Sequence, residues 1–533
     1  MPIEGHGGEL IAAALRARGV DSAFTLIGGH IFAVLDGAQR QGIRVVDVRH
    51  EQAAGFAAEA HGKLARAPGV AAVDAGPGVL NAVNVLASAR TNGSPMVLIA
   101  GKPPQSLIGK GALNETSQTE VISPLAKRTI TLDDIGTVFE RAAGAYDAAA
   151  ARHRGPVYVE APLDTLMARA TASAIAPGAA PATVHGDLEG AAALLSAADR
   201  PLLFLGSDVW LDGAEATARA LAEKQRIPVV MNGMARGILP SDHALAFSAA
   251  RGAAFKRADV ILIVGVPLDF RLGYGWNFGE AKVVHLQDDV SGIASHIGLA
   301  ASASGPIAEL LDGLALATPR ERDGWLDELR GVESQRRGGY RDELSSAVAP
   351  IHPARVYGEL VPRLPRDAIV IADGGDFASY AGKYVEVFEP GGWLDPGPYG
   401  CLGTSAGYAL GAGSLYPNRK IVVLLGDGAA GFSLADWDSL VRHSIDVTFV
   451  CGNNGAWGLE KQPMRGLYGR EVAADLRPGT RYDEVMRAFG GHGELVREPA
   501  ELGDAIARAL ATEGPSLVNV ITDPEIAYPR GSG

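Results

Sequence analysis

Short runs of β-branched and aliphatic residues alternate with alanine-rich amphipathic stretches along the whole sequence. This alternation is typical of repeated strand–helix–strand units, in which parallel strands form a sheet and helices cover both of its faces. Because 533 residues exceed what one hydrophobic core usually supports, several such sheets are expected. We therefore predict an α/β protein made of three consecutive doubly wound parallel-sheet domains.

Two stretches without a core-strand pattern divide the chain. Residues 168–185 are rich in alanine and proline, as linkers are, and residues 320–343 form a charged segment with helical character. The predicted domains are residues 1–165, 186–335 and 350–533. The strands expected in them are residues 23–27, 43–48, 70–74, 95–100 and 156–160; 201–206, 227–232, 260–266 and 283–288; and 368–373, 421–426, 447–452 and 516–522.

The formal net charge is −13, which argues against nucleic acid or an anionic membrane as the main partner. The two cysteines, Cys401 and Cys451, are too few for a disulfide framework, and their apolar or glycine-rich surroundings indicate buried, reduced thiols. The sequence shows neither a signal-peptide pattern nor a run of ~18 apolar residues. We therefore expect a cytoplasmic protein whose partner is a small molecule.

The stretch 421–457 carries the most specific pattern. It reads IVVLLGDGAAGFSLADWDSLVRHSIDVTFVCGNNGAW, so one buried strand ends in Gly426-Asp427-Gly428 and a second ends in Asn453-Asn454. Glycines let the backbone approach a phosphate, and the amides at a helix N-terminus donate hydrogen bonds to it. Asp427 and Asn454 each follow a parallel strand, at the sheet edge where open α/β folds bind ligands.

Asp427 and Asn454 offer one carboxylate and one amide oxygen, which are hard ligands that suit Mg²⁺ or Ca²⁺. With phosphate and water completing the coordination shell, the pattern predicts a magnesium-bridged diphosphate. A helix-capping aspartate in a turn would explain an isolated Gly-Asp-Gly equally well. The asparagine that follows Asp427 after 27 residues favours the metal site.

This segment resembles the diphosphate-binding motif of thiamine-diphosphate-dependent enzymes, in which Gly-Asp-Gly is followed at this distance by an asparagine pair. The resemblance implies that Mg²⁺ is held by Asp427, Asn454 and the backbone carbonyl of Ala456. The cofactor-binding residues that it implies in this segment are Gly426, Asp427, Gly428, Ala429, Asn454, Ala456 and Trp457.

Glu51 begins a helix rich in small residues directly after the predicted strand 43–48. A glutamate favoured by the helix dipole is one interpretation. The family resemblance implies another, in which Glu51 hydrogen-bonds the pyrimidine ring of the cofactor and activates it. Residues 76–81 resemble the GPG-x-x-N loop that lies near the same ring, with Gly76 and Asn81 as its contacts, although an ordinary turn has the same composition.

Two further segments of the third domain match the family. Residues 399–403 resemble the segment whose bulky apolar residue props the cofactor in its bent shape, which assigns that role to Leu402 beside Gly400. A leucine next to glycines is otherwise a core residue. Asp373 and Gly374 end the first predicted strand of this domain and are candidate diphosphate contacts. Because Glu51 lies in the first domain, the resemblance also implies a homodimer or homotetramer with sites at the subunit interface.

Within the family, the chain is most similar to the acetolactate synthase large-subunit group, which includes benzaldehyde lyase and 2-hydroxyacyl-CoA lyases. His30, in the loop after the first strand, can relay a hydroxyl proton, although it can also be structural. Asn114 stands where synthases carry a glutamine that touches the substrate. Trp457 is either a wall of the acceptor pocket, as in benzaldehyde lyase, or a core residue.

These features predict a carboligase that decarboxylates a 2-keto acid such as pyruvate and joins the fragment to a second carbonyl. Glu51, His30 and Asn114 are its candidate catalytic residues. The alternative is a lyase that cleaves 2-hydroxy ketones or 2-hydroxyacyl-CoA to an aldehyde and a second fragment. A catalytically inactive subunit and an FAD-dependent oxidase are rivals; residues 269–271 resemble a flavin-contacting stretch, but FAD is not predicted.

Overall fold

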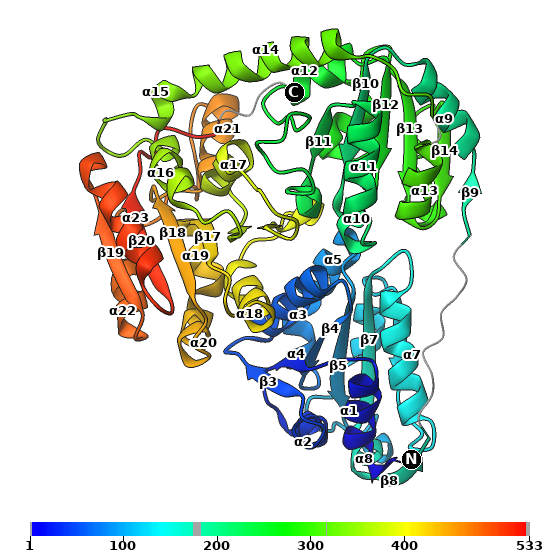
Figure 1. Cartoon of the computed structure of the whole chain (residues 1–533). Helices are drawn as coiled ribbons and strands as arrows, with labels where there is room; N and C mark the ends of the chain where they lie inside the picture. Colours follow the sequence, from blue (N-terminus) through cyan, green and yellow to red (C-terminus); the bar gives the residue numbers. More distant parts are fainter. Residues whose placement is uncertain (1–2, 174–182, 316, 529–533) are drawn as a thin grey trace.

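The computed structural model describes residues 3–173, 183–315 and 317–528. It contains three six-stranded sheets, one in each third of the chain (Figure 1). The predicted α/β class and the three parallel-sheet domains are confirmed. Among the described residues, no helix is both long enough and apolar enough to cross a bilayer.

The first sheet is wholly parallel, in the order β3-β2-β4-β5-β7-β6. Every residue of its inner strand β7 is buried, as expected where helices cover both faces. The elements of this part of the chain are β2 (Ser22–Thr25), β3 (Arg44–Asp47), β4 (Gly69–Val73), β5 (Met96–Lys102), β6 (Arg128–Thr131) and β7 (Pro156–Pro162), with α1 (Gly7–Ala17), α2 (Phe32–Arg40), α3 (Glu51–Ala65), α4 (Pro77–Asn81), α5 (Val83–Asn92), α6 (Gln118–Ile122), α7 (Val138–Ala150) and α8 (Leu163–Met167).

The central sheet has the order β11-β10-β12-β13-β14-β9, and only the β14–β9 pair is antiparallel. Helix α14 runs from it towards the third domain (Figure 1). The elements are β9 (His185–Gly186), β10 (Pro201–Leu205), β11 (Val229–Met231), β12 (Val260–Val264), β13 (Lys282–Gln287) and β14 (Ala301–Ser304), with α9 (Leu188–Ala197), α10 (Ser207–Leu211), α11 (Glu215–Gln225), α12 (Arg251–Arg257), α13 (Ile307–Leu314), α14 (Asp323–Gly339) and α15 (Arg341–Leu344).

The third sheet is again wholly parallel, in the order β16-β15-β17-β18-β20-β19. Its inner strands β17 and β18 are almost entirely buried. The elements are β15 (Ile369–Ala372), β16 (Trp393–Leu394), β17 (Ile421–Gly426), β18 (Val447–Asn453), β19 (His492–Val496) and β20 (Ser516–Ile521), with α16 (Pro353–Leu360), α17 (Asp376–Tyr384), α18 (Ser405–Leu415), α19 (Asp427–Ser433), α20 (Trp437–Arg442), α21 (Gly458–Tyr468), α22 (Tyr482–Ala488) and α23 (Leu502–Ala511).

The segment expected to be a linker is partly structured. Its strand β8 (Arg169–Ala172) pairs antiparallel with β1 (Ile3–His6) and ties the two ends of the first domain together. Residues 174–182 of that segment lie outside the described residues. The exact domain limits therefore stay a prediction.

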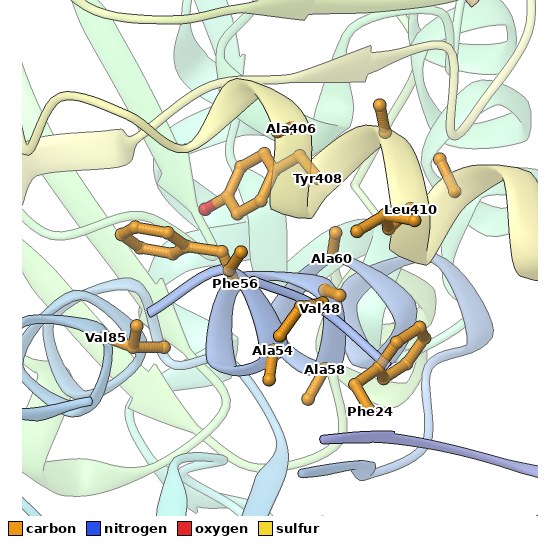
Figure 2. Packing of buried hydrophobic residues seen from close by; sticks show 14 of the residues in the cluster. Phe24, Val48, Ala54, Phe56, Ala58, Ala60, Val85, Ala406, Tyr408 and Leu410 are labelled. Atoms are coloured by element: carbon orange, nitrogen blue, oxygen red, sulfur yellow. The ribbon is translucent and has the colours of Figure 1, made fainter. Parts of the chain in front are cut away.

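Helices α3 and α18 join the first and third domains. They approach closely because small residues face one another; a Cβ added at Gly411 would lie 2.3 Å from the backbone oxygen of Ala57. The ring of Phe56 meets that of Tyr408 edge to face, with centroids 5.8 Å apart (Figure 2). Both aromatic side chains are fully buried. This contact makes the two domains one packed unit.

We expect Phe56→Ala to lower the free energy of unfolding by about 3–5 kcal/mol, because it leaves a cavity in the packed contact between the first and third domains. Urea unfolding followed by circular dichroism measures the change. Phe270→Ala is the matched control, since Phe270 is exposed and its loss should cost less than about 0.5 kcal/mol. Equal effects of the two substitutions would contradict the importance of the contact.

Candidate active site

A pocket of about 190 Å³ opens at the carboxyl edge of the third sheet. Strand β17 ends at Gly426 and helix α19 starts at Asp427, while the neighbouring strand β18 ends immediately before Asn454. Gly426 and Gly452 are register partners on these parallel strands. The two polar side chains are therefore brought to the same edge, as the sequence predicted.

Ten of the residues proposed to bind the cofactor line this pocket. Trp457 forms one wall and stands edge to face with Phe432, with ring centroids 6.3 Å apart. A Cβ on Gly428 would lie 2.4 Å from the Trp457 ring, so only glycine fits there without a shift. The ten are Gly374, Gly400, Leu402, Gly426, Asp427, Gly428, Ala429, Asn454, Ala456 and Trp457.

The polar groups of the pocket are held by the backbone. The Gly455 N–H donates to Asp427 Oδ2 at 2.9 Å, and the Ala456 N–H donates to Asn454 Oδ1 at 3.0 Å. Burial raises the pKa of Asp427 to about 6, because the desolvated carboxylate lacks a cationic partner strong enough to offset its burial. A carboxylate and an amide oxygen at this edge fit a hard divalent cation.

Asp373 has a different environment from the one expected of a cofactor contact. It is fully buried behind the pocket and accepts hydrogen bonds from the backbone N–H groups of Gly374, Gly403 and Ser405, at 2.9, 3.0 and 3.1 Å. Burial raises the pKa of Asp373 even though these bonds oppose the rise. The carboxylate thus fixes the loop that carries Leu402, and the geometry gives Asp373 a positioning role.

A second cluster lies in the first domain, around the start of α3. Glu51 is buried there, and Asn81 Nδ2 donates to Glu51 Oε2 at 2.9 Å. Gly76 adopts φ +59°, which favours glycine, and its N–H donates to Gln118 Oε1 at 3.0 Å. Glu51, Gly76 and Asn81 are therefore neighbours, as the two separate motifs predicted.

Asp74 connects the two other candidate catalytic residues. Its Oδ1 accepts from the backbone N–H of His30 at 2.9 Å and lies 3.1 Å from His30 Nδ1. Its Oδ2 accepts from Asn114 Nδ2 at 3.2 Å. Asn114 itself has φ +61°, a conformation that asparagine tolerates better than most residues. His30 and Asn114 are thus brought together by one carboxylate.

The two clusters do not share a pocket within one chain. All described residues that line the third-domain pocket lie between positions 374 and 460, whereas Glu51, His30 and Asn114 lie in the first domain. One chain therefore presents two separate halves of the predicted site.

Sequence reasoning missed two residues of the first-domain cluster, Asp74 and Gln118. Asp74 was the last residue of the predicted strand 70–74, a position at which polar side chains often face a ligand. Gln118 gave no such signal, because its contacts to Gly76, Gly101 and Glu160 depend on the tertiary fold.

Comparison with known proteins agrees with the division of the chain into three domains. The chain matches the thiamine pyrophosphate enzyme N-terminal TPP binding domain over residues 5–121, the central domain over 188–314 and the C-terminal TPP binding domain over 373–520. The chain belongs to the thiamine pyrophosphate enzymes. It is a thiamine-diphosphate-dependent enzyme of the acetolactate synthase-like group, as the sequence motifs indicated.

Two kinds of relative span nearly the whole chain. An acetolactate synthase large subunit of Mycobacterium tuberculosis is 48% identical over 99% of this chain and 97% of its own length. A 2-hydroxyacyl-CoA lyase 2 of Homo sapiens is 34% identical over 95% of this chain and 87% of its own length, and that of Caenorhabditis elegans is 32% identical over 97% and 89%. None of these names or family descriptions refers to a flavin, so FAD has no support here.

Asp373→Asn should destabilise the third domain by about 1–3 kcal/mol. The asparagine amide has only one acceptor oxygen, and its NH₂ group would face buried backbone N–H groups that need an acceptor. Thermal unfolding with and without thiamine diphosphate measures the loss, and we expect weaker cofactor binding because the Leu402 loop is released. Asp367→Asn, at an exposed position, is the control. A melting temperature and cofactor affinity equal to those of the control would rule out the positioning role.

Proposed function

We propose that this enzyme is a magnesium-dependent carboligase that decarboxylates a 2-keto acid such as pyruvate and joins the fragment to a second carbonyl. The observation that carries this proposal is the 48% identity to an acetolactate synthase large subunit along virtually the whole chain. Thiamine diphosphate, when bound, supplies the nucleophilic carbon that adds to the substrate carbonyl. The protein contributes binding, orientation and proton transfer.

The cation and diphosphate would be held by the third-domain pocket. Asp427, Asn454 and the Ala456 carbonyl are the proposed magnesium ligands, and the glycines around them leave room for phosphate oxygens. A bound cation would displace the proton that burial favours on Asp427 near pH 6 and below. Leu402, in the loop that Asp373 fixes, lines the pocket and would contact the bound cofactor.

Glu51 would activate the cofactor from the first domain. The hydrogen bond from Asn81 already orients its carboxyl group, and a buried carboxyl is able to exchange a proton with a ring nitrogen. His30 and Asn114 would handle the substrate, with the imidazole moving the hydroxyl proton and the carboxamide holding an oxygen. Asp74 positions both side chains.

A second candidate function is C–C bond cleavage of a 2-hydroxy ketone or 2-hydroxyacyl-CoA. It is supported by the identity of about one third to 2-hydroxyacyl-CoA lyases over most of the chain. It is also supported by the first-domain cluster, because an imidazole that removes a hydroxyl proton serves cleavage as well as ligation. The substrates considered are small molecules in either case.

We further propose that the functional unit is a homodimer or homotetramer. Each half of the site is bordered by exposed apolar side chains, Ile27, Phe32 and Leu113 beside the first-domain cluster and Phe432 beside the third-domain pocket. Exposed apolar groups of this size mark interaction surfaces. If Glu51 of one chain faces the third-domain pocket of another chain, the two halves together form a complete site. The buried free thiols Cys401 and Cys451 fit the cytoplasmic location that we expect.

The first experiment is product analysis. Protein reconstituted with thiamine diphosphate and Mg²⁺ should convert pyruvate to CO₂ and acetolactate, and Glu51→Gln should lower kcat at least ~100-fold because the activating carboxyl is lost. Glu498→Gln, on the exposed surface, is the control. If pyruvate is untouched while a 2-hydroxyacyl-CoA is cleaved in a Glu51-dependent way, the lyase function replaces the carboligase.

Mixed dimers test where the sites lie. Glu51→Gln and Asp427→Asn should each abolish activity, yet purified mixed dimers of the two variants should recover about half of the wild-type activity, because one of the two sites in each mixed dimer is intact. Recovery is measured after tandem-tag purification of the mixed species. No recovery in purified mixed dimers would show that each site is built from a single chain.

A further inference from the structure

Three ionisable side chains meet at the junction of the first and central domains, away from the thiamine-diphosphate pocket. His153 comes from the loop between α7 and β7, Asp208 from α10 and Asp288 from the residue after β13. One potential ligand atom of each lies within 4.8 Å of the other two. Strands β10 and β13 flank β12 in parallel, so Asp208 and Asp288 lie at the carboxyl edge of the central sheet.

Both carboxylates are buried and incompletely paired. Asp208 is 4% exposed, and none of the hydrogen bonds found in the described part of the chain reaches its carboxylate. Asp288 is 3% exposed; its Oδ1 lies 2.8 Å from His153 Nδ1, but its Oδ2 is buried without a hydrogen-bond partner. Burying a carboxylate without donors is costly, so a positive charge between these oxygens would be favourable.

The neighbouring cations do not fully supply that charge. Arg154 Nη1 stays 3.8 Å from Asp288 Oδ2, because Arg154 Nη2 is hydrogen-bonded to Asp212 at 2.9 Å. Arg152 is also bound to Asp212, through two nitrogens. Lys127 faces the cluster from the first domain, but burial lowers its pKa to about 8, which weakens its hold on a proton.

We propose that His153, Asp208 and Asp288 form a second divalent-cation site, selective for the zinc and manganese class of ions. One imidazole nitrogen and two carboxylate oxygens suit Zn²⁺ and Mn²⁺, whereas Mg²⁺ prefers oxygen ligands alone. The ring edge with Nε2 faces Gly93, where an added Cβ would lie 2.8 Å away, so Nδ1 is the ligating atom.

The surroundings leave room for the remaining ligands of the ion. His153 and Asp208 line a pocket of about 40 Å³, together with the oxygen-bearing side chains of Ser207 and Asn232. Water in this pocket would complete the coordination shell. The ion would link a loop of the first domain to two strand ends of the central sheet, and this site is independent of the proposed carboligase function.

The cluster should release protons when it binds the ion. Burial and the nearby charge of Asp288 raise the pKa of Asp208 to about 7. Burial lowers the pKa of His153, but its hydrogen bond to Asp288 and the charge of Asp208 outweigh that effect and raise it overall. A cation binds the deprotonated forms of these ligands and competes with protons for them, so affinity should increase as the pH rises.

Isothermal titration of ZnCl₂ and MnCl₂ into the holoenzyme, saturated with thiamine diphosphate and Mg²⁺, tests the proposal. We expect about one Zn²⁺ per chain, with at least tenfold tighter binding at pH 8 than at pH 6 and an enthalpy that depends on the buffer's ionisation. Asp208→Asn and His153→Gln should each weaken Zn²⁺ binding at least tenfold. His443→Gln is the matched control, because His443 also pairs with one aspartate, Asp47, at 3.1 Å.

Zinc-induced thermal stabilisation separates a lost ligand from a damaged fold. Asp208→Asn removes an unpaired buried charge, so the metal-free variant should melt no lower than the wild type, while the upward shift caused by Zn²⁺ should disappear. Wild-type binding no tighter than that of Asp208→Asn would overturn the proposal. So would Zn²⁺ uptake that survives both cluster substitutions, since the ion would then be bound elsewhere.

Discussion

The contact between α3 and α18 is the constraint on which both halves of the active site depend. Alanine and glycine on the facing surfaces let the two backbones approach, and the buried Phe56–Tyr408 pair fills the space that remains. Glu51 is the first residue of one helix, and the Leu402 loop leads directly into the other. This helix pair thus fixes the Glu51 carboxyl and the Leu402 loop, although these two residues are more than three hundred positions apart in the sequence.

The third-domain site was predictable because its signal is local. Strands that are apolar and buried have carboxyl ends that meet at one sheet edge, so polar residues after β17 and β18 had to become neighbours. Every inner strand of the three sheets except β14 was predicted for the same reason. Six of the strands that escaped prediction, β1, β6, β8, β9, β16 and β19, lie at sheet edges. The seventh, β14, consists of alanine and serine, so none of the seven shows a long apolar run.

What sequence could not reveal is how a side chain is used once the chain is folded. Asp373 directly follows a strand, as Asp427 does, yet its carboxylate accepts hydrogen bonds from three backbone N–H groups and Asp373 does not line the pocket. Asp74 follows a strand as well, and it holds His30 and Asn114. Three aspartates in similar local sequence therefore have three environments, and only tertiary contacts distinguish them. This is also why substrate choice between synthase and lyase chemistry is harder to infer than cofactor binding.

The antiparallel pairing of β1 with β8 has a consequence beyond the stability of the first domain. Because residues 3–6 lie hydrogen-bonded against residues 169–172, the polypeptide enters and leaves this domain at the same place. A domain whose two ends are adjacent can be exchanged for the corresponding domain of a relative, or joined to another protein, without changing the path of the rest of the chain. The β1–β8 ribbon is in this sense a natural boundary for recombination and for the construction of chimaeric enzymes.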